Sequence, residues 1–219
     1  MATIQVEGRG KATATPDEIE LQLTVASFLP EYGQALEDLD RKIVSLKDAF
    51  VSSGLERATI KTQDFSVNIE REYREDGKDH FSGYRATHTL VVRVPLDRQV
   101  LNALLAACPA SDATPEVNIR FRIRDQLELQ RQALEAAFID ARKSAELLAR
   151  SSGGALGELV EILYGERRGP TTQNYRVSQE AGRISYCKVS YADQIEPENI
   201  VCSEVVSATW KVLNLNEAM

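Results

Sequence analysis

An alanine at every fourth position from residue 133 to residue 149 restricts the fold of this chain more than any other sequence feature. The series consists of Ala133, Ala137, Ala141, Ala145 and Ala149. This spacing is helical, so all five side chains fall on one side of a helix predicted over residues 125–152. Leu127, Phe138 and Leu148 extend an apolar stripe that shares Ala141 and Ala145. We therefore predict a long helix that packs closely on a sheet through small side chains and ends at Gly153-Gly154.

Alternation of apolar and polar residues predicts several strands around this helix. It is clearest in residues 18–25, where Ile19, Leu21, Leu23 and Val25 alternate with polar residues, the pattern of a strand with one buried face. Similar alternation marks residues 4–6, 65–69, 84–94, 117–123, 159–163 and 206–212, and helical spacing marks residues 31–53 and a short segment after Pro95. Together these elements predict an α+β fold. An antiparallel or mixed sheet packs with about three helices in the order β-β-α-β-β-α-β-α-β-loop-β.

Residues 165–199 lack any sustained period and carry several Gly and Pro residues. Such a stretch is typical of a long loop, so we predict that residues 165–199 are mobile. A short edge strand at Ser185–Ser190 is compatible with this prediction. The length of 219 residues fits one large domain or two small ones, and we predict a single domain over residues 1–219.

The charge balance disfavours nucleic acid as a partner. The formal net charge is −7, from 26 Lys and Arg against 33 Asp and Glu, whereas binding to a phosphate backbone needs clustered basic residues. No apolar run approaches the length of a membrane span, and the first residues lack the apolar core of a secretory signal. Three widely spaced cysteines, Cys108, Cys187 and Cys202, favour a reducing compartment. We therefore expect a cytoplasmic protein without a membrane span.

No catalytic motif, metal site or cofactor site emerges from the sequence. Gly8-Arg9-Gly10 lacks the third glycine of a dinucleotide fingerprint and the Ser or Thr of a P-loop, so a strand bulge or bend is the preferred interpretation. His80 is expected in a polar hairpin loop and His88 at the margin of the core. Neither histidine has a second ligand at metal-binding spacing, and no Gly-x-Ser-x-Gly elbow is present.

Three arginines form the one candidate binding surface. Arg120, Arg122 and Arg124 alternate with apolar residues, so a strand would carry all three on one face. Such a face is a hypothetical anion-binding surface, because guanidinium groups bind anions in a bidentate manner. The alternative is a solvated face whose arginines pair across strands with carboxylates such as Glu18 or Glu20.

The ordered set of motifs resembles the SIMPL (DUF541) family from about residue 4 to about residue 213. The matching segments are Val6-Glu7-Gly8-Arg9-Gly10, Pro16-Asp17, Gly54, Ile60-Lys61-Thr62, Gly83-Tyr84, Asp140-Ala141, Ala145, Leu148-Ala149 and Leu156-Gly157. The resemblance implies an α+β fold and structural roles for Gly8, Gly10, Pro16, Asp17, Gly83, Tyr84, Ala141 and Gly157. It implies no catalytic residues. Family members are often exported and have been linked to oxidative stress and to signalling scaffolds.

These observations favour a non-enzymatic cytoplasmic protein that acts through self-association or protein partners, with a link to stress implied by the resemblance. A small-molecule or anion binder that uses the Arg120, Arg122 and Arg124 face is the first alternative, and an enzyme with an unrecognised site is the second. We expect a homo-oligomer, because the strands around Ile4–Val6 and Val206–Val212 have little charge and no Pro to protect an open sheet edge.

Overall fold

The computed structural model describes residues 2–73, 79–165 and 195–214. Their contacts group them into two compact units. The terminal unit contains the described parts of residues 1–15, 123–179 and 198–219, and the central unit contains those of residues 16–122 and 180–197. Our prediction of one domain over residues 1–219 stays a prediction, because two contact units can still fold together. The predicted loop at 165–199, with the strand at Ser185–Ser190, lies mostly outside the described residues.

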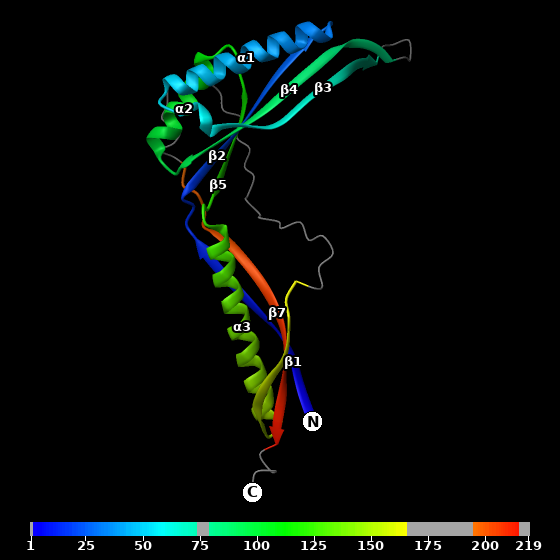
Figure 1. The fold of residues 1–219 in the computed structure, drawn as a ribbon, viewed down its shortest axis with the longest axis vertical. Helices are drawn as coiled ribbons and strands as arrows, with labels where there is room; N and C mark the ends of the chain where they lie inside the picture. Colours follow the sequence, from blue (N-terminus) through cyan, green and yellow to red (C-terminus); the bar gives the residue numbers. More distant parts are fainter. Residues whose placement is uncertain (1, 74–78, 166–194, 215–219) are drawn as a thin grey trace. The chain divides into compact units, whose positions relative to one another are not determined.

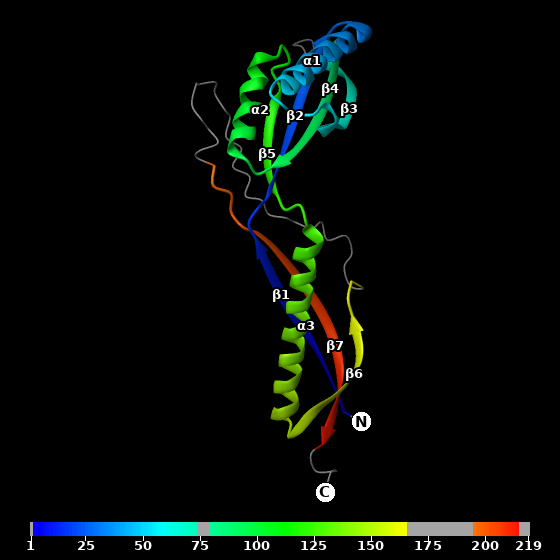
Figure 2. The ribbon, with the colours of Figure 1, turned by 60° about the vertical axis from the view of Figure 1, so that its left-hand side comes forward.

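The terminal unit is one helix on a three-stranded antiparallel sheet (Figures 1 and 2). Its strands are β1 (Ala2–Ala14), β6 (Gly154–Leu163) and β7 (Ile200–Asn214), in the order β1-β7-β6, and its helix is α3 (Gln126–Ser151). The first and last strands of the described chain therefore pair with each other, from Ala2 opposite Val212 to Ala14 opposite Ile200. Our premise that β7 presents an open edge is wrong, since β7 is the central strand.

The alanine ridge of α3 is fully buried. Leu129 is also buried, and Ala133, Ala137, Ala141, Ala145 and Ala149 are each 0% exposed. The larger residues that we placed on the same stripe differ, because Leu127 is 73% and Leu148 is 48% exposed. A helix pressed this close to a sheet has room only for methyl groups along the contact line, so the leucines lie beside that line.

The alanine ridge of α3 packs against β1 at Gly8 and Gly10. A Cβ atom added to Gly8 would lie 2.1 Å from the carbonyl oxygen of Ala137, and one added to Gly10 would lie 2.0 Å from that of Ala133. The pairing of β1 with β7 runs through both glycines without a register shift. Of the bulge or bend that we predicted at Gly8-Arg9-Gly10, the register excludes the bulge, and close approach of the α3 backbone accounts for both glycines.

The central unit packs two helices on one face of a four-stranded antiparallel sheet. The elements are β2 (Glu18–Leu29), α1 (Tyr32–Ser52), the 3₁₀ turn η1 (Arg57–Thr59), β3 (Ile60–Tyr73), β4 (Asp79–Pro95), α2 (Arg98–Ala110) and β5 (Glu116–Arg122). The strand order is β3-β4-β2-β5, which leaves β3 and β5 at the edges. The alternating residues Ile19, Leu21, Leu23 and Val25 are all 0% exposed and form the centre of the core.

The predicted fold class and element order are confirmed. The chain is α+β with three α-helices among the described residues, and each paired strand is antiparallel. The strands divide between two sheets, one in each unit. Within the described ranges, no helix combines the length and apolar character needed to cross a membrane.

Candidate functional site

Five large side chains of the central unit form an exposed aromatic surface. They are Tyr32, Phe65, Ile69, Tyr73 and Phe81, and each is more than half exposed. Phe65, Ile69 and Tyr73 lie four residues apart on β3, so their side chains share one face of the strand. That face carries Tyr84 and His88 of β4, which lie opposite Ile69 and Phe65.

Ring contacts join these side chains into two sets, which the pairing of β3 with β4 places at neighbouring positions of one face. Tyr84 makes edge-to-face contacts with Tyr32 of α1 at 5.5 Å and with Phe81 at 5.2 Å between ring centroids. Phe65 meets the His88 ring in the same manner at 5.6 Å. Helix α1 covers β2 and β4 but leaves the edge strand β3 open, so the outer part of the patch faces solvent.

A second cluster surrounds Glu20 on the opposite face of the central sheet. Glu20 is 5% exposed, and its carboxylate accepts hydrogen bonds from Arg93 and Arg122, each at 2.8 Å. Arg120 lies 4.0 Å from the same carboxylate. The strand register explains this convergence, because Glu20 of β2 is flanked by Arg93 of β4 and Arg120 of β5. Three arginines thus converge on one carboxylate.

The structure brings together two of the three arginines that we singled out. Arg120 and Arg122 share a face of β5, as the alternation predicted, and both contact Glu20 as the cross-strand alternative described. Arg124 follows the end of β5 and belongs to the terminal unit. Anion binding by these arginines stays a prediction. No sequence pattern marks Arg93, because only the strand register shows that it lies opposite Glu20.

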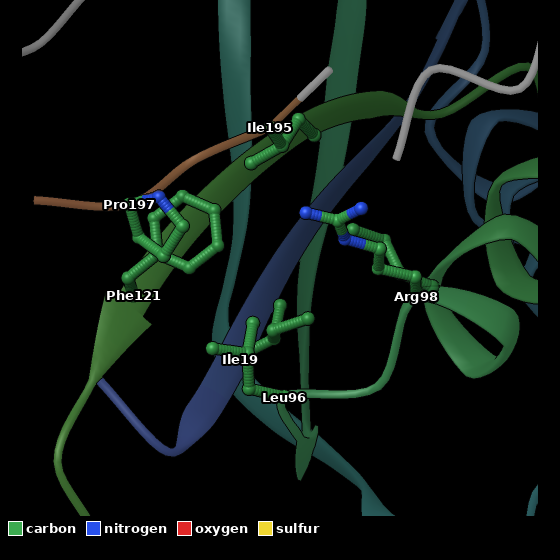
Figure 3. A pocket seen from close by; sticks show the side chains of 7 residues that line it. Ile19, Leu96, Arg98, Phe121, Ile195 and Pro197 are labelled. Atoms are coloured by element: carbon green, nitrogen blue, oxygen red, sulfur yellow. The ribbon is translucent and has the colours of Figure 1, made fainter. Parts of the chain in front are cut away.

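A small pocket opens beside α2 in the central unit (Figure 3). Its volume is about 210 Å³, and its apolar walls come from Ile19, Leu96, Leu101, Phe121, Ile195 and Pro197. Arg98, the first residue of α2, is the one charged residue that lines it. In Figure 3 the Arg98 guanidinium points into the space between Ile195 and Ile19. The sequence did not single out Arg98, since no periodic pattern marks a residue at a helix start.

The histidines and thiols of the described chain lie apart from these surfaces or at their margin. His80 lies within β4 opposite Glu72, so its predicted place in the hairpin loop is wrong. His88 lies at the core margin as predicted, with Nε2 at 2.8 Å from Thr62 Oγ1, and burial lowers its pKa. Burial also raises the pKa of the Cys108 thiol to about 11. Among the residues that the structure describes, no cluster of three or more His, Cys, Asp or Glu could hold a metal ion.

The motif residues are found at close approaches, turns and bulges. Pro16 and Asp17 lie between β1 and β2, where the Asp17 N–H donates to the Arg122 carbonyl at 3.1 Å. Gly83 has a φ of +156°, and a Cβ there would lie 2.8 Å from the Leu29 carbonyl oxygen. Gly157 lies at a register shift of β6, and a Cβ added there would lie 3.1 Å from the Lys211 carbonyl oxygen.

Comparison with known proteins confirms the family resemblance found in the sequence. The family model SIMPL, described as "Protein of unknown function (DUF541)", matches residues 4–210 and so spans both units. The chain is also similar to "Uncharacterized protein YggE" of Edwardsiella ictaluri (strain 93-146). The two are 24% identical over 186 residues, which cover 83% of this chain and 77% of that protein. Because the family model matches nearly the whole length, the chain belongs to the SIMPL (DUF541) family.

Proposed function

We propose that this protein is not an enzyme and that it acts by associating with copies of itself through the aromatic surface. The proposal rests on five large side chains that share one patch and are each more than half exposed, namely Tyr32, Phe65, Ile69, Tyr73 and Phe81. Scattered apolar residues are ordinary on protein surfaces, whereas a contiguous patch of large side chains marks an interaction site. Aromatic residues are also enriched in the buried centres of protein interfaces.

The edge strand β3 supports the same proposal. It lies at one end of the β3-β4-β2-β5 sheet, so one of its sides has no strand partner among the described residues. Its fourteen residues contain no Pro that would block addition of another strand. Antiparallel two-fold pairing of two copies along β3 would continue the sheet, set the two aromatic surfaces side by side on one face and close the assembly.

Light scattering after size exclusion tests the proposal. The wild-type mass is expected at a multiple of 24.3 kDa, and the double variant Phe65→Ser, Ile69→Ser is expected to shift toward 24.3 kDa. The matched control is Leu127→Ser, Ile139→Ser, which removes two exposed apolar side chains from α3. A wild-type mass of 24.3 kDa that stays constant on concentration would overturn self-association, and capture experiments would then test a different protein partner.

A second candidate function is anion binding at the Glu20 cluster. Three guanidinium groups converge on the carboxylate of Glu20, which makes this face of the sheet a candidate site for an anion. Arg93, Arg120 and Arg122 are 56%, 44% and 34% exposed, respectively. Titration with inorganic phosphate tests this function, and Arg120→Gln is expected to weaken the binding. The control Arg131→Gln, on α3 in the terminal unit, is expected to leave it unchanged.

The same proposal places the protein in the cytoplasm, with a role connected to stress. Cys108 and Cys202 are both free thiols, and free thiols persist in reducing compartments. Burial raises the pKa of both thiols, which keeps them protonated and slow to oxidise. Cell fractionation tests the location, and survival of a deletion strain under peroxide tests the role. Recovery of the protein outside the cytoplasm would contradict the first, and unchanged survival would contradict the second.

A further inference from the structure

We propose that the pocket beside α2 binds a small organic anion, with an apolar body against the pocket walls and a carboxylate on Arg98. The pocket shares no residue with the aromatic surface or with the Glu20 cluster. The inference therefore stands independently of the function proposed above. We base it on three properties of the pocket: its size, its apolar walls and its single charge.

The size of the pocket selects a small ligand. Its volume of about 210 Å³ exceeds the roughly 150 Å³ of an engineered cavity that binds benzene. It is below the range of about 300–1,000 Å³ that is typical of sites for drug-sized molecules. A single ring or a short branched chain with one polar head group therefore fits, whereas a nucleotide or a dinucleotide does not.

The core preforms one side of the pocket. Ile19 is 0% and Leu101 is 1% exposed, so neither side chain can move away without disrupting the packing of the central unit. Phe121 lies opposite Ile19 in the strand register, and Ile195 packs against the same core from outside the sheet. A ligand that enters such a preformed apolar space loses little free energy to rearrangement of the protein.

The positive charge of Arg98 at the pocket favours an anionic ligand. Arg98 is exposed, and no described carboxylate forms an ion pair with it. The neighbouring Asp97 carboxylate instead caps α2, because it accepts a hydrogen bond from the Gln99 N–H at 2.7 Å. The Arg98 guanidinium points into the pocket space (Figure 3), where its parallel N–H groups suit bidentate pairing with a carboxylate.

Titration of methyl-labelled protein with three probes of similar size tests the proposal. The probes are benzoate, benzyl alcohol and benzylamine, which differ in the charge of the head group. The reporters are the methyl resonances of Ile19, Leu96, Leu101 and Ile195. Benzoate is expected to shift these resonances and to bind about tenfold more tightly than benzyl alcohol, with benzylamine weakest. Equal affinities, or no shift with millimolar benzoate, would overturn the proposal.

Two variants assign the effect to the pocket. Arg98→Met keeps the apolar stem of the side chain and is expected to reduce benzoate affinity to that of benzyl alcohol. Ile195→Trp fills the space and is expected to abolish binding of all three probes. The control Arg131→Met changes an exposed arginine on α3 and is expected to leave all affinities unchanged. Methyl resonances of Leu39, Ile43 and Leu46, which belong to the core of the central unit but do not line the pocket, verify that each variant is folded. Unchanged benzoate affinity in Arg98→Met would overturn the role of the arginine.

Discussion

The backbone N–H of Arg9 donates a hydrogen bond to a carboxylate oxygen of Asp140, 2.9 Å away. Arg9 lies on β1, an edge strand of the terminal sheet, and Asp140 lies on α3. Edge strands carry unpaired backbone donors that can recruit other chains. The helix therefore satisfies one of these donors with a side chain at the position where its backbone comes closest to Gly8 and Gly10.

Removal of this acceptor is expected to destabilise the protein modestly. We expect Asp140→Ala to lower the free energy of unfolding by about 0.5–1.5 kcal/mol, the usual net value of one hydrogen bond. Asp140→Asn retains an oxygen acceptor and is expected to recover most of the loss. Urea unfolding measures both. Equal losses in the two variants would show that the negative charge, rather than the hydrogen bond, is what matters.

A methyl group at Gly8 is expected to lower the free energy of unfolding far more than the loss of the Asp140 acceptor does. It would lie 2.1 Å from the Ala137 carbonyl oxygen and 2.3 Å from the Ala141 nitrogen, and backbone atoms of a packed helix cannot move aside locally. We expect Gly8→Ala to cost more than about 3 kcal/mol, above the usual range for overpacking. The control is Gly33→Ala in α1, where nothing lies within 4 Å of the added Cβ, so a neutral or stabilising effect is expected. Thermal unfolding of both variants distinguishes close approach from a general intolerance of glycine replacement.

The alanine ridge is expected to resist enlargement from the helix side as well. Ala141 is 0% exposed, so Ala141→Leu is expected to destabilise the fold by about 1–3 kcal/mol. The neighbouring Ile139 is 53% exposed, and Ile139→Leu is expected to change stability by less than about 0.5 kcal/mol. A denaturant midpoint for Ala141→Leu equal to that of the wild type would contradict the packing of α3 on β1.

Glu20 is expected to stabilise the central sheet by holding its arginines together. Glu20→Gln removes the charge that offsets Arg93, Arg120 and Arg122, and we expect a loss of about 1–3 kcal/mol. Added salt is expected to reduce this loss, because it screens the repulsion between the remaining guanidinium groups. The control Glu70→Gln breaks the more exposed pair with Arg85 and is expected to cost less than about 1 kcal/mol. Equal losses in the two variants would contradict a special role for Glu20.

Local periodicity was sufficient to predict the elements of this fold. Each strand and helix has its own pattern, such as the alternation of Ile19, Leu21, Leu23 and Val25, and that pattern does not depend on the partner. Pairing between distant segments is different, because it depends on which surfaces meet. The position of β7 between β1 and β6, and the division of the strands between two sheets, therefore could not be predicted from alternation.

Alternation also did not predict which side chains meet at the candidate surfaces. Alternation correctly placed Arg120 and Arg122 on one face of β5, but Arg93 joins them only through the pairing of β4 with β2. Likewise, Phe65 and Ile69 have the alternation of a buried strand, yet they are exposed because α1 ends its coverage at β4. Single-strand patterns indicate which side chains share a face. They do not indicate whether a helix covers that face.

A final prediction concerns the carboxylate of Asp38 on α1, which is only 18% exposed. The pKa of Asp38 is lowered from 3.8 to about 2. The causes are a hydrogen bond and ion pair with Lys42, a hydrogen bond from Ser27 at 2.7 Å, and contact with Arg41. The folded state thus favours the ionised form more than the unfolded state does. The resulting stabilisation is fully present above the unfolded pKa and is lost as pH falls from about 4 to about 2.

Asp38→Asn tests this linkage against Asp48→Asn, whose partner Arg57 is 59% exposed. Near neutral pH, Asp38→Asn is expected to lower the free energy of unfolding by about 1–2 kcal/mol, and Asp48→Asn by less than about 1 kcal/mol. The difference between wild type and Asp38→Asn should then shrink as the pH falls below about 4, because the wild-type carboxyl loses its charge in the unfolded state first. Urea unfolding at several pH values measures the difference, and carboxyl ¹³C titration measures the pKa of Asp38 directly. A difference that stays constant down to about pH 2 would show that Asp38 acts through packing rather than through its charge.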